Sequence, residues 1–335
     1  MAVIEVENLT KVYRINQKDP GVAGAVKALF WPHYQEKVAV DGISFGIEPG
    51  EIVGYIGVNG AGKSTTIKML TGILMPTRGR VRVMGRDPFR QRVANAREIG
   101  VVFGQRTQLY WDLALIESLN LISKIYDVEP VRFQQLLDQF SETLNLKELL
   151  KVPVRNMSLG QRMRSELAAA LIHEPQVVYL DEPTIGLDVM AKEAIRNFIR
   201  EQNRTRSTTV VLTTHDLGDI EELCRRVIII DSGKVLYDGP ITTIKERFGK
   251  YRTISFEAAA GSRPDSIDLP DGAEPVAEEE ERLVLRFDRT RTTASQVAAS
   301  IMAQMEVRDF ALAEPDLESV IKQIYSGALR EEVGA

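Results

Sequence analysis

Apolar and polar positions follow one another along most of the chain with two different periodicities. Segments with apolar runs or with every second position apolar predict strands, and segments with apolar positions three or four residues apart predict helices. Strands are expected at 3–7, 43–47, 51–57, 80–85, 99–105, 177–182, 208–215 and 227–239. Helices are expected at 64–74, across most of 111–172, at 191–202 and at 219–226. Strands alternating with helices in this way indicate a largely parallel sheet covered on both faces.

The pattern changes near residues 245–250, which indicates a second and smaller domain. Beyond this point the sequence predicts strands at 254–257 and 283–287, a helix at 294–305, a further strand and a last helix at 316–325. The polar, acidic stretch at 260–282 is expected to be a loop. We therefore predict an α/β domain over 1–245, with an inserted helical subdomain at about 110–172. A small α+β domain follows at 246–335.

The composition is that of an ordinary globular protein and excludes several classes. Of the 335 residues, 44% are apolar and 27% are charged, and the net charge of −5 lacks the basic field of a nucleic-acid-binding protein. The one cysteine, Cys224, excludes an internal disulfide and fits a reducing compartment. No window approaches the roughly 20 apolar residues that span a bilayer, and the amino terminus lacks an apolar signal core. We expect a cytoplasmic protein that reaches a membrane only through partners.

A glycine-rich segment at 57–64 carries the pattern G-x4-G-K-S between an expected strand and an expected helix. Glycines allow a turn whose N–H groups converge on phosphate oxygens, helped by the helix amino terminus. Lys63 would reach the β- and γ-phosphates, and the Ser64 hydroxyl would ligate Mg²⁺. The alternative is a turn that merely reverses the chain, but this pattern is rare by chance. The residues expected to bind nucleotide here are Gly57, Val58, Asn59, Gly60, Ala61, Gly62, Lys63, Ser64 and Thr65.

Two acidic residues, Asp181 and Glu182, follow the apolar segment 177–180. They would lie at the carboxyl end of a buried strand, where ligands bind in open α/β sheets. Asp181 is expected to hold Mg²⁺ through water, and Glu182 to polarise the water that attacks the phosphate. Because a proline comes next, an acidic helix cap is the alternative interpretation. The phosphate-binding pattern favours the catalytic one.

A short motif, Ser158-Leu159-Gly160-Gln161, opens the alanine-rich segment 161–172. With the phosphate-binding segment it makes residues 3–245 resemble the nucleotide-binding subunits of ABC transporters. The resemblance implies the fold of a P-loop NTPase, with ATP and Mg²⁺ as cofactors. It also implies that Ser158, Gly160 and Gln161 contact the γ-phosphate bound to the opposite subunit, so that two copies of the chain form a homodimer around ATP.

Leu159 departs from the family pattern, in which glycine usually follows the serine. If this residue needs a positive φ, leucine carries about 1 kcal/mol of strain or more. If it is helical, leucine is harmless. A plain serine N-cap is the alternative interpretation of the whole motif.

Four further positions acquire a role only through the resemblance. It implies that Gln105 touches Mg²⁺ and the attacking water, that Asp188 couples the two active sites, and that His215 orients the γ-phosphate. It also implies that Tyr13 stacks on adenine. Without the resemblance, Gln105 would be an ordinary polar residue at a strand end and Asp188 an aspartate in a loop. His215 would be a structural histidine, and Tyr13 a half-buried tyrosine of a strand.

The sequence most resembles the exporter-type ATPases of the ABC-2 class. The resemblance implies integral membrane permease subunits as partners and a place at the cytoplasmic face of the cell membrane, and the net charge of −5 indicates no nucleic acid as a partner. It implies docking of the permease at 106–118. An insertion like 16–38 also occurs in polysaccharide and teichoic-acid exporters, so a glycan exporter is an alternative.

The insertion at 16–38 contains Val26, Leu29, Phe30 and Trp31. It is either an amphipathic turn that packs on a membrane subunit or bilayer, or a loop packed on its own domain. Two other functional classes fit less well. ABC proteins of ribosomes or chromosomes usually have two cassettes or a long coiled coil, and a P-loop kinase or GTPase does not explain the motif at Ser158.

Overall fold

The computed structural model describes residues 2–17, 33–104, 107–248, 251–259, 267–279, 282–313 and 317–325. The chain forms two compact units, Met1–Gly239 and Pro240–Ala335. The first unit has the mixed α/β architecture that the sequence predicts. Within the described ranges, no helix is both long enough and apolar enough to cross a membrane.

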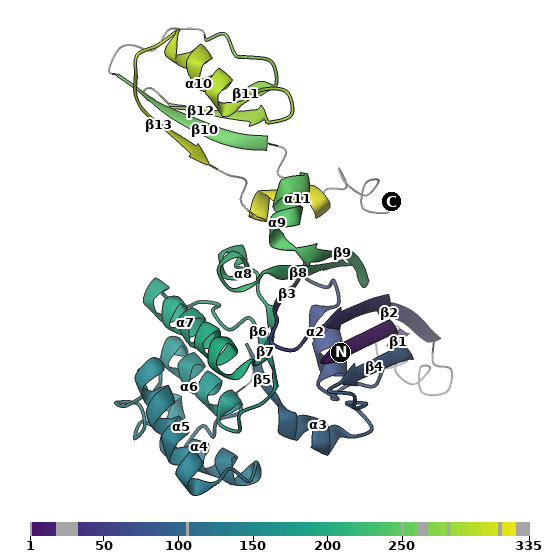
Figure 1. The fold of residues 1–335 in the computed structure, drawn as a ribbon. Coiled ribbons are helices and arrows are strands. Elements are labelled where there is room, and N and C mark those ends of the chain that lie inside the picture. The colour runs from purple at the N-terminus through teal and green to yellow at the C-terminus, as the bar shows by residue number, and fades with distance from the viewer. Residues whose placement is uncertain are drawn as a thin grey trace. The chain divides into compact units, whose positions relative to one another are not determined.

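A six-stranded sheet forms the centre of the first unit (Figure 1). Its order is β5-β6-β7-β3-β8-β9, and β5, β6, β7, β3 and β8 pair in parallel. The strands are β3 (Ile52–Gly57), β5 (Ile99–Phe103), β6 (Val177–Asp181), β7 (Thr209–Thr213), β8 (Arg226–Asp231) and β9 (Lys234–Pro240). The runs of valine, leucine and isoleucine in β3, β6, β7 and β8 are buried, as expected for parallel strands covered on both faces.

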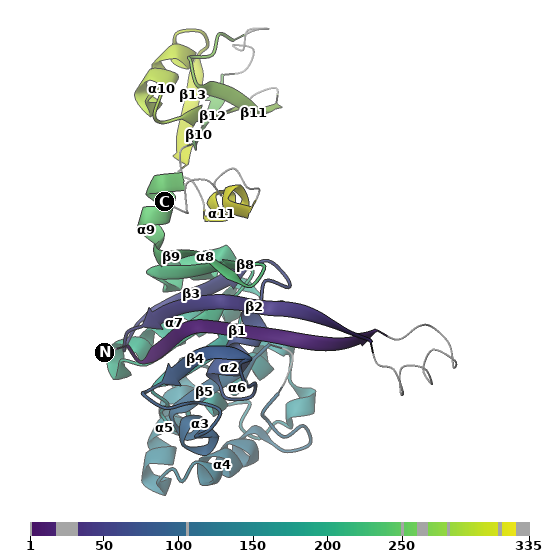
Figure 2. The same cartoon turned by 90° about the vertical axis from the view of Figure 1, so that its right-hand side faces the viewer.

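A second, antiparallel sheet of order β2-β1-β4 was not predicted as a separate layer. It consists of β1 (Ile4–Gln17), β2 (His33–Ile47) and β4 (Arg78–Val83). β1 and β2 extend far beyond the predicted 3–7 and 43–47, because they pair, with register shifts between Val6 and Val12, as far as Gln17 and His33. Figure 2 shows this long hairpin in purple. The predicted insertion is thus partly strand, and Val26, Leu29, Phe30 and Trp31 lie outside the described residues.

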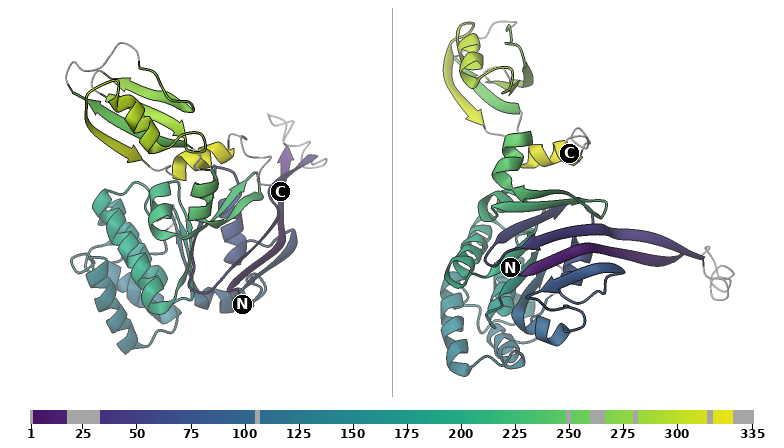
Figure 3. Two further views of the ribbon diagram at one scale, coloured as in Figure 1. Left: turned by 45° about the horizontal axis from the view of Figure 1, so that its top comes forward. Right: turned by 45° about the vertical axis from the view of Figure 1, so that its right-hand side comes forward.

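Helices cover both faces of the parallel sheet. The helices α4–α7 gather on one side, and α2 lies on the other, between the two sheets (Figures 1 and 3). Buried side chains of α2, β1, β2 and β4 join those of the parallel strands in one core. The bounds are α2 (Lys63–Leu70), α3 (Arg92–Glu98), α4 (Leu115–Ile125), α5 (Pro130–Thr143), η1 (Val154–Asn156), α6 (Leu159–Leu171), α7 (Val189–Arg206) and α8 (Leu217–Leu223).

The second unit contains a four-stranded sheet of order β11-β12-β10-β13, with the helix α10 packed on its buried core. Its elements are α9 (Ile241–Phe248), β10 (Tyr251–Ala258), β11 (Ala273–Glu279), β12 (Arg282–Asp288), α10 (Ala294–Met302), β13 (Val307–Ala313) and α11 (Leu317–Tyr325). The prediction of a loop throughout 260–282 is wrong at β11. This acidic strand pairs with β12, and Arg286 Nε donates to Glu274 Oε1 across the pair at 2.7 Å.

One glycine of the first unit, Gly79, allows β4 to approach β1 closely at a point where their pairing is irregular. Gly79 has φ +82°, and a Cβ added there would lie 2.2 Å from the carbonyl oxygen of Asn8. Asn8 lies in the stretch of β1, between Glu7 and Thr10, where the register of β1 against β4 shifts. Gly85 has a similar φ of +73°, but a Cβ there would meet nothing within 4 Å.

We predict that Gly79→Ala destabilises the first unit by about 2–4 kcal/mol, because it adds a backbone clash to left-handed strain. Gly85→Ala, which adds strain alone, should cost only about 1–2 kcal/mol. Urea unfolding followed by circular dichroism measures both. Equal losses of unfolding free energy in the two variants would contradict the role given to the contact with Asn8.

Candidate functional site

The phosphate loop, residues 57–64, joins the end of β3 to the start of α2. Gly60 and Gly62 have φ values of +86° and +110°, which glycine adopts without strain. A Cβ on Gly62 would lie 2.5 Å from the carbonyl oxygen of Ala39, so this position has no room for a side chain. In the described part of the chain, no side chain caps the start of α2, and its first turn carries no acidic residue. The free N–H groups there form an anion-binding site.

Lys63 lies over the loop that precedes it. Its Nζ donates to the carbonyl oxygens of Gly57 at 2.5 Å and of Val58 at 3.3 Å. Burial lowers the pKa of Lys63 because it disfavours the charged ammonium, while the nearby carboxylates of Glu182 and Asp181 act in the opposite direction. The Lys63 Nζ is thus held against the carbonyl oxygens at the start of the loop.

A cavity of ≈ 490 Å³ opens over the phosphate loop. The β1–β2 hairpin forms its opposite wall, where Tyr13 presents an aromatic ring. Lys11 Nζ lies 5.5 Å from the centre of that ring, a cation–π contact. The lining residues are Tyr13, Arg14, Ile15, Lys37, Ala39, Val58, Asn59, Gly60, Gly62, Lys63, Ser64, Thr65 and Glu182.

The acidic pair at the end of β6 lies beside the loop. Thr213 donates its hydroxyl proton to Asp181, and Glu182 N donates to Thr213 O at 2.8 Å. Glu182 has a φ of 55°, and its Oε1 lies 2.9 Å from His215 Nε2. The next helix, α7, begins only at Val189, so the alternative of a helix cap at Asp181 and Glu182 is wrong.

A smaller cavity of ≈ 310 Å³ brings Ser64, Asp181 and Glu182 together. The other lining residues are Lys68, Ile73, Phe103 and Gly104. One hydroxyl and two carboxylates are the hard oxygen donors that Mg²⁺ prefers, and Mg²⁺ commonly completes its shell with water and substrate phosphates. The residues present therefore fit the expected ion.

Gln105, the remaining expected contact to Mg²⁺ and water, lies outside the described residues. The segment just after it is anchored to α6 by Glu166, a buried carboxylate that sequence reasoning missed. Thr107 donates its hydroxyl proton to Glu166, and Gln108 N donates to Glu166 Oε2 at 3.2 Å. Burial raises the pKa of Glu166, and these hydrogen bonds oppose that rise. A glutamate within an alanine-rich run was the only signal in the sequence.

The Ser158 motif caps α6. Ser158 Oγ accepts from Gln161 N at 3.3 Å, and Gln161 Oε1 accepts from Ser158 N at 2.9 Å. Leu159 is the first residue of α6, so the harmless alternative for this leucine is confirmed. Its Cδ2 lies 3.1 Å from the place of a Cβ on Gly186, which sets the motif beside the segment 184–188.

These residues do not meet the phosphate loop within one chain. Among the described residues, Ser158, Gly160, Gln161 and Asp188 form no part of the walls of the two cavities at the loop. Asp188 caps α7 through a bond from Ala191 N at 2.8 Å and lines a different cavity. The structure thus brings together Tyr13, the loop, Asp181, Glu182 and His215, and leaves Ser158, Gly160, Gln161 and Asp188 apart from them.

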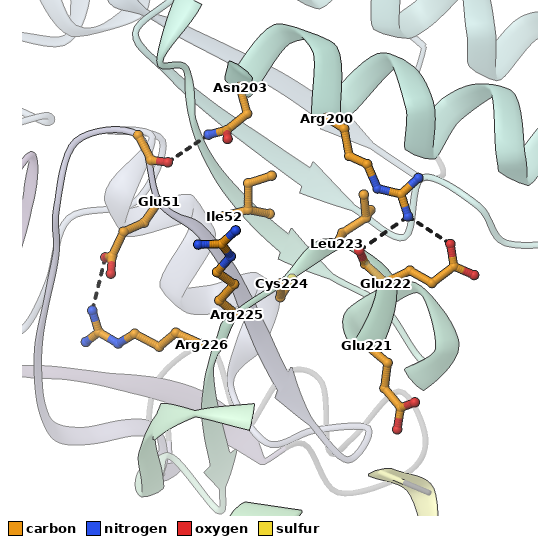
Figure 4. Close-up of a pocket in the computed structure, with 11 residues that line it drawn as sticks. Glu51, Ile52, Arg200, Asn203, Glu221, Glu222, Leu223, Cys224, Arg225 and Arg226 are labelled. Carbon is orange, nitrogen blue, oxygen red and sulfur yellow. Dashed lines mark hydrogen bonds and ion pairs between the residues drawn. The ribbon is translucent and has the colours of Figure 1, made fainter. Parts of the chain in front are cut away.

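A larger cavity of ≈ 670 Å³ is lined by α7, the α8–β8 connection and the start of β3 (Figure 4). Its charges are largely paired within the wall. Arg200 Nη2 donates to Glu222 Oε2 at 2.9 Å, and Arg226 Nη1 to Glu51 Oε2 at 3.1 Å. Because it contains no part of the phosphate loop and its charges offset one another, we do not assign the nucleotide to it.

The chain is similar to known proteins in sequence and in fold. The family model described as ABC transporter matches residues 40–185. The chain is 32% identical over 289 residues to the daunorubicin resistance ATP-binding protein DrrA3 of Streptomyces coeruleorubidus, covering 86% of this chain and 91% of that protein. It is 35% identical over 250 residues to the Nod factor export ATP-binding protein I of Paraburkholderia xenovorans (strain LB400), covering 74% and 79%.

The solved structure of an ATP binding subunit of an ABC transporter has the same fold. It superposes with a TM-score of 0.62 at 26% identity, covering 74% of this chain and 93% of that one. The chain therefore belongs to the ABC transporter family as one of its ATP-binding ATPases, which confirms the family, the fold class and the ATPase activity expected from its sequence.

Proposed function

We propose that two copies of this chain close around ATP and drive export through separate membrane subunits at the cytoplasmic face of the cell membrane. The separation of Ser158 from the phosphate loop supports this most directly. Each chain carries a phosphate loop with Glu182 and His215, and a capped helix start at Ser158 that has no part in its own cavity. Two copies related by a two-fold axis complete two equal sites.

In this proposal each group has a stated task. Lys63 and the N–H groups of the loop bind the phosphates, and Tyr13 stacks on adenine. Glu182 accepts a proton from the attacking water, while His215 fixes that carboxylate and contacts the γ-phosphate. Ser64 and Asp181 would hold Mg²⁺, with Gln105 as a further expected ligand. When bound, the ion neutralises charge on the β- and γ-phosphates.

The surface around Ser158 supports contact with a second copy. Val189 and Met190, at the start of α7, are each 75% exposed, and Ile185 is 51% exposed. Leu159 lies beside this group through its approach to Gly186. Exposed apolar side chains at the start of α7, beside the N–H groups at the start of α6, suit an interface that covers a nucleotide. Asp188 lies within the same segment, consistent with its expected role between the two sites.

We predict that Glu182→Gln lowers the rate of ATP hydrolysis by about 100-fold or more, because the amide cannot accept the proton of the attacking water. ATP affinity should stay within about twofold, since the phosphate loop is intact. Size-exclusion chromatography with ATP should then show an accumulated dimer. Glu142→Gln, on an exposed part of α5, is the control. Undiminished hydrolysis would exclude Glu182 as the essential carboxylate.

A mixing experiment tests whether each site uses two chains. Lys63→Ala removes the phosphate contact, and Ser158→Asp repels the γ-phosphate while aspartate still caps α6. Each variant alone should be inactive. An equimolar mixture should recover about a quarter of the wild-type rate, because half of the dimers are mixed and each mixed dimer has one intact site. If the mixture stays inactive although mixed dimers form, the two-chain site is wrong.

We further propose that a membrane subunit docks in an apolar groove of ≈ 620 Å³ between α3 and the end of α4. Ile73, Val93 and Ile125 line it and are 59%, 68% and 57% exposed. Arg92 and Arg97 also line it, which suits a short helix with apolar and acidic side chains. Tyr110 and Trp111, exposed in the segment 106–118, offer a further contact on the helical subdomain.

We predict that Val93→Glu reduces co-purification of integral membrane subunits by about tenfold or more, because it places a charge in an apolar interface. The ATPase rate of the isolated chain should not change. Val131→Glu, at a position of α5 that is 62% exposed, is the matched control. Equal recovery of membrane subunits with both variants would exclude the groove.

Export as the direction of transport has separate support. The relatives named above include a Nod factor export protein and a daunorubicin resistance protein. The alternative of a polysaccharide or lipid-linked glycan exporter rests on the insertion between β1 and β2. The identity of the co-purified membrane subunits distinguishes these classes, and the absence of any membrane subunit from a stable ATPase complex would favour a ribosomal or chromosomal ABC protein.

A further inference from the structure

A carboxylate on α8, Asp219, is fully buried, although the mechanism above does not use it. It accepts a hydrogen bond from the hydroxyl of Thr184, and its Oδ1 lies 3.0 Å from Nε of Arg196 on α7. Burial raises the pKa of Asp219, and both the Thr184 bond and Arg196 oppose that rise. A charge is tolerated at such depth only where its partners hold it closely.

The two ends of this contact lie next to the reacting groups. Thr184 comes two residues after Glu182 and is 1% exposed. Asp219 comes four residues after His215, in the helix that begins at Leu217. Between Glu182 and α7 the backbone forms only loose turns, such as Leu187 N to Thr184 O at 3.3 Å. The side-chain contact is therefore a direct tie between the segment that follows Glu182 and the helix that follows His215.

The charges around this tie come from α7 and α8 and are themselves paired. Arg196 also pairs with Glu222, and Lys192 pairs with Asp216. These pairs hold α7 against α8, and they would do so without Thr184. The hydroxyl of Thr184 adds the link to the segment 182–188, which the ion pairs do not reach.

We propose that Asp219 is a positioning residue for ATP hydrolysis, which through Thr184 fixes the Glu182 carboxylate relative to His215. The inference rests on the proposed role of Glu182. The Oε1 to Nε2 distance of 2.9 Å is short enough that a small shift of either segment breaks it. Displacing a catalytic group by about 1 Å is enough to cost about 100-fold in rate.

The test replaces Thr184 and measures kcat, KM and nucleotide affinity in the full chain. Thr184→Val keeps the shape and removes the donor, so kcat should fall about tenfold or more while KM and ATP affinity stay within about twofold. Thr184→Ser restores the donor and should recover most of the lost kcat. Ile220→Val removes one methyl group from the same helix without touching Thr184, and it should leave kcat unchanged.

A kcat for Thr184→Val within about twofold of wild type would overturn the proposal. A kcat for Thr184→Ser no higher than that for Thr184→Val would overturn it too. An equal loss of kcat in Ile220→Val would also overturn it, because it would mark a loss of stability alone. If Thr184→Val does not fold, Thr184→Ala replaces it, since its smaller side chain leaves room for water beside Asp219. Glu182→Gln is measured in parallel. Full activity in that variant refutes the role of Glu182 itself, whereas its inactivity beside an active Thr184→Val refutes only the positioning role.

Discussion

The whole site depends on how closely two neighbouring backbones approach the turn between β3 and α2. A Cβ on Gly57 would lie 2.6 Å from the carbonyl oxygen of Ile230 on β8, and one on Gly62 would lie 2.5 Å from that of Ala39 on β2. The loop therefore has its shape because β8 and β2 confine it, and only glycine fits between them. The buried core of α2 and both sheets fixes those strands. The N–H groups that face a phosphate are thus placed by strands distant in sequence.

The parallel register then brings the acidic groups to the same edge. Asp181 pairs with Thr213 across β6 and β7, so each strand ends beside the other. Glu182 and His215 come one and two residues later, where the strands have ended and their side chains can meet. Ser158, in contrast, lies at the start of a helix on the side of the sheet that α4–α7 cover. The groups proposed for hydrolysis thus lie at one edge of the sheet, whereas Ser158, proposed to contact the nucleotide of the second copy, lies in the helical layer.

The sequence predicted well what is local and poorly what depends on a distant partner strand. The phosphate loop, the strand ending at Asp181 and the capped helix at Ser158 all follow from contiguous residues. The long β1–β2 pairing does not, because residues 12–17 form a strand only opposite 33–38. That pairing is also what brings Tyr13 to the cavity wall. The acidic segment 273–279 is likewise a strand because β12 offers it hydrogen bonds and basic partners such as Arg286.

Two buried carboxylates escape sequence reasoning for the same reason, since an acidic residue on an amphipathic helix ordinarily faces solvent. Glu166 and Asp219 are 5% and 0% exposed, and each binds a threonine from another segment. Leaving such a group without its partner costs about 1–3 kcal/mol or more. Each pair therefore joins a loop segment to a helix: Glu166 joins the segment 107–108 to α6, and Asp219 joins the segment after Glu182 to α8.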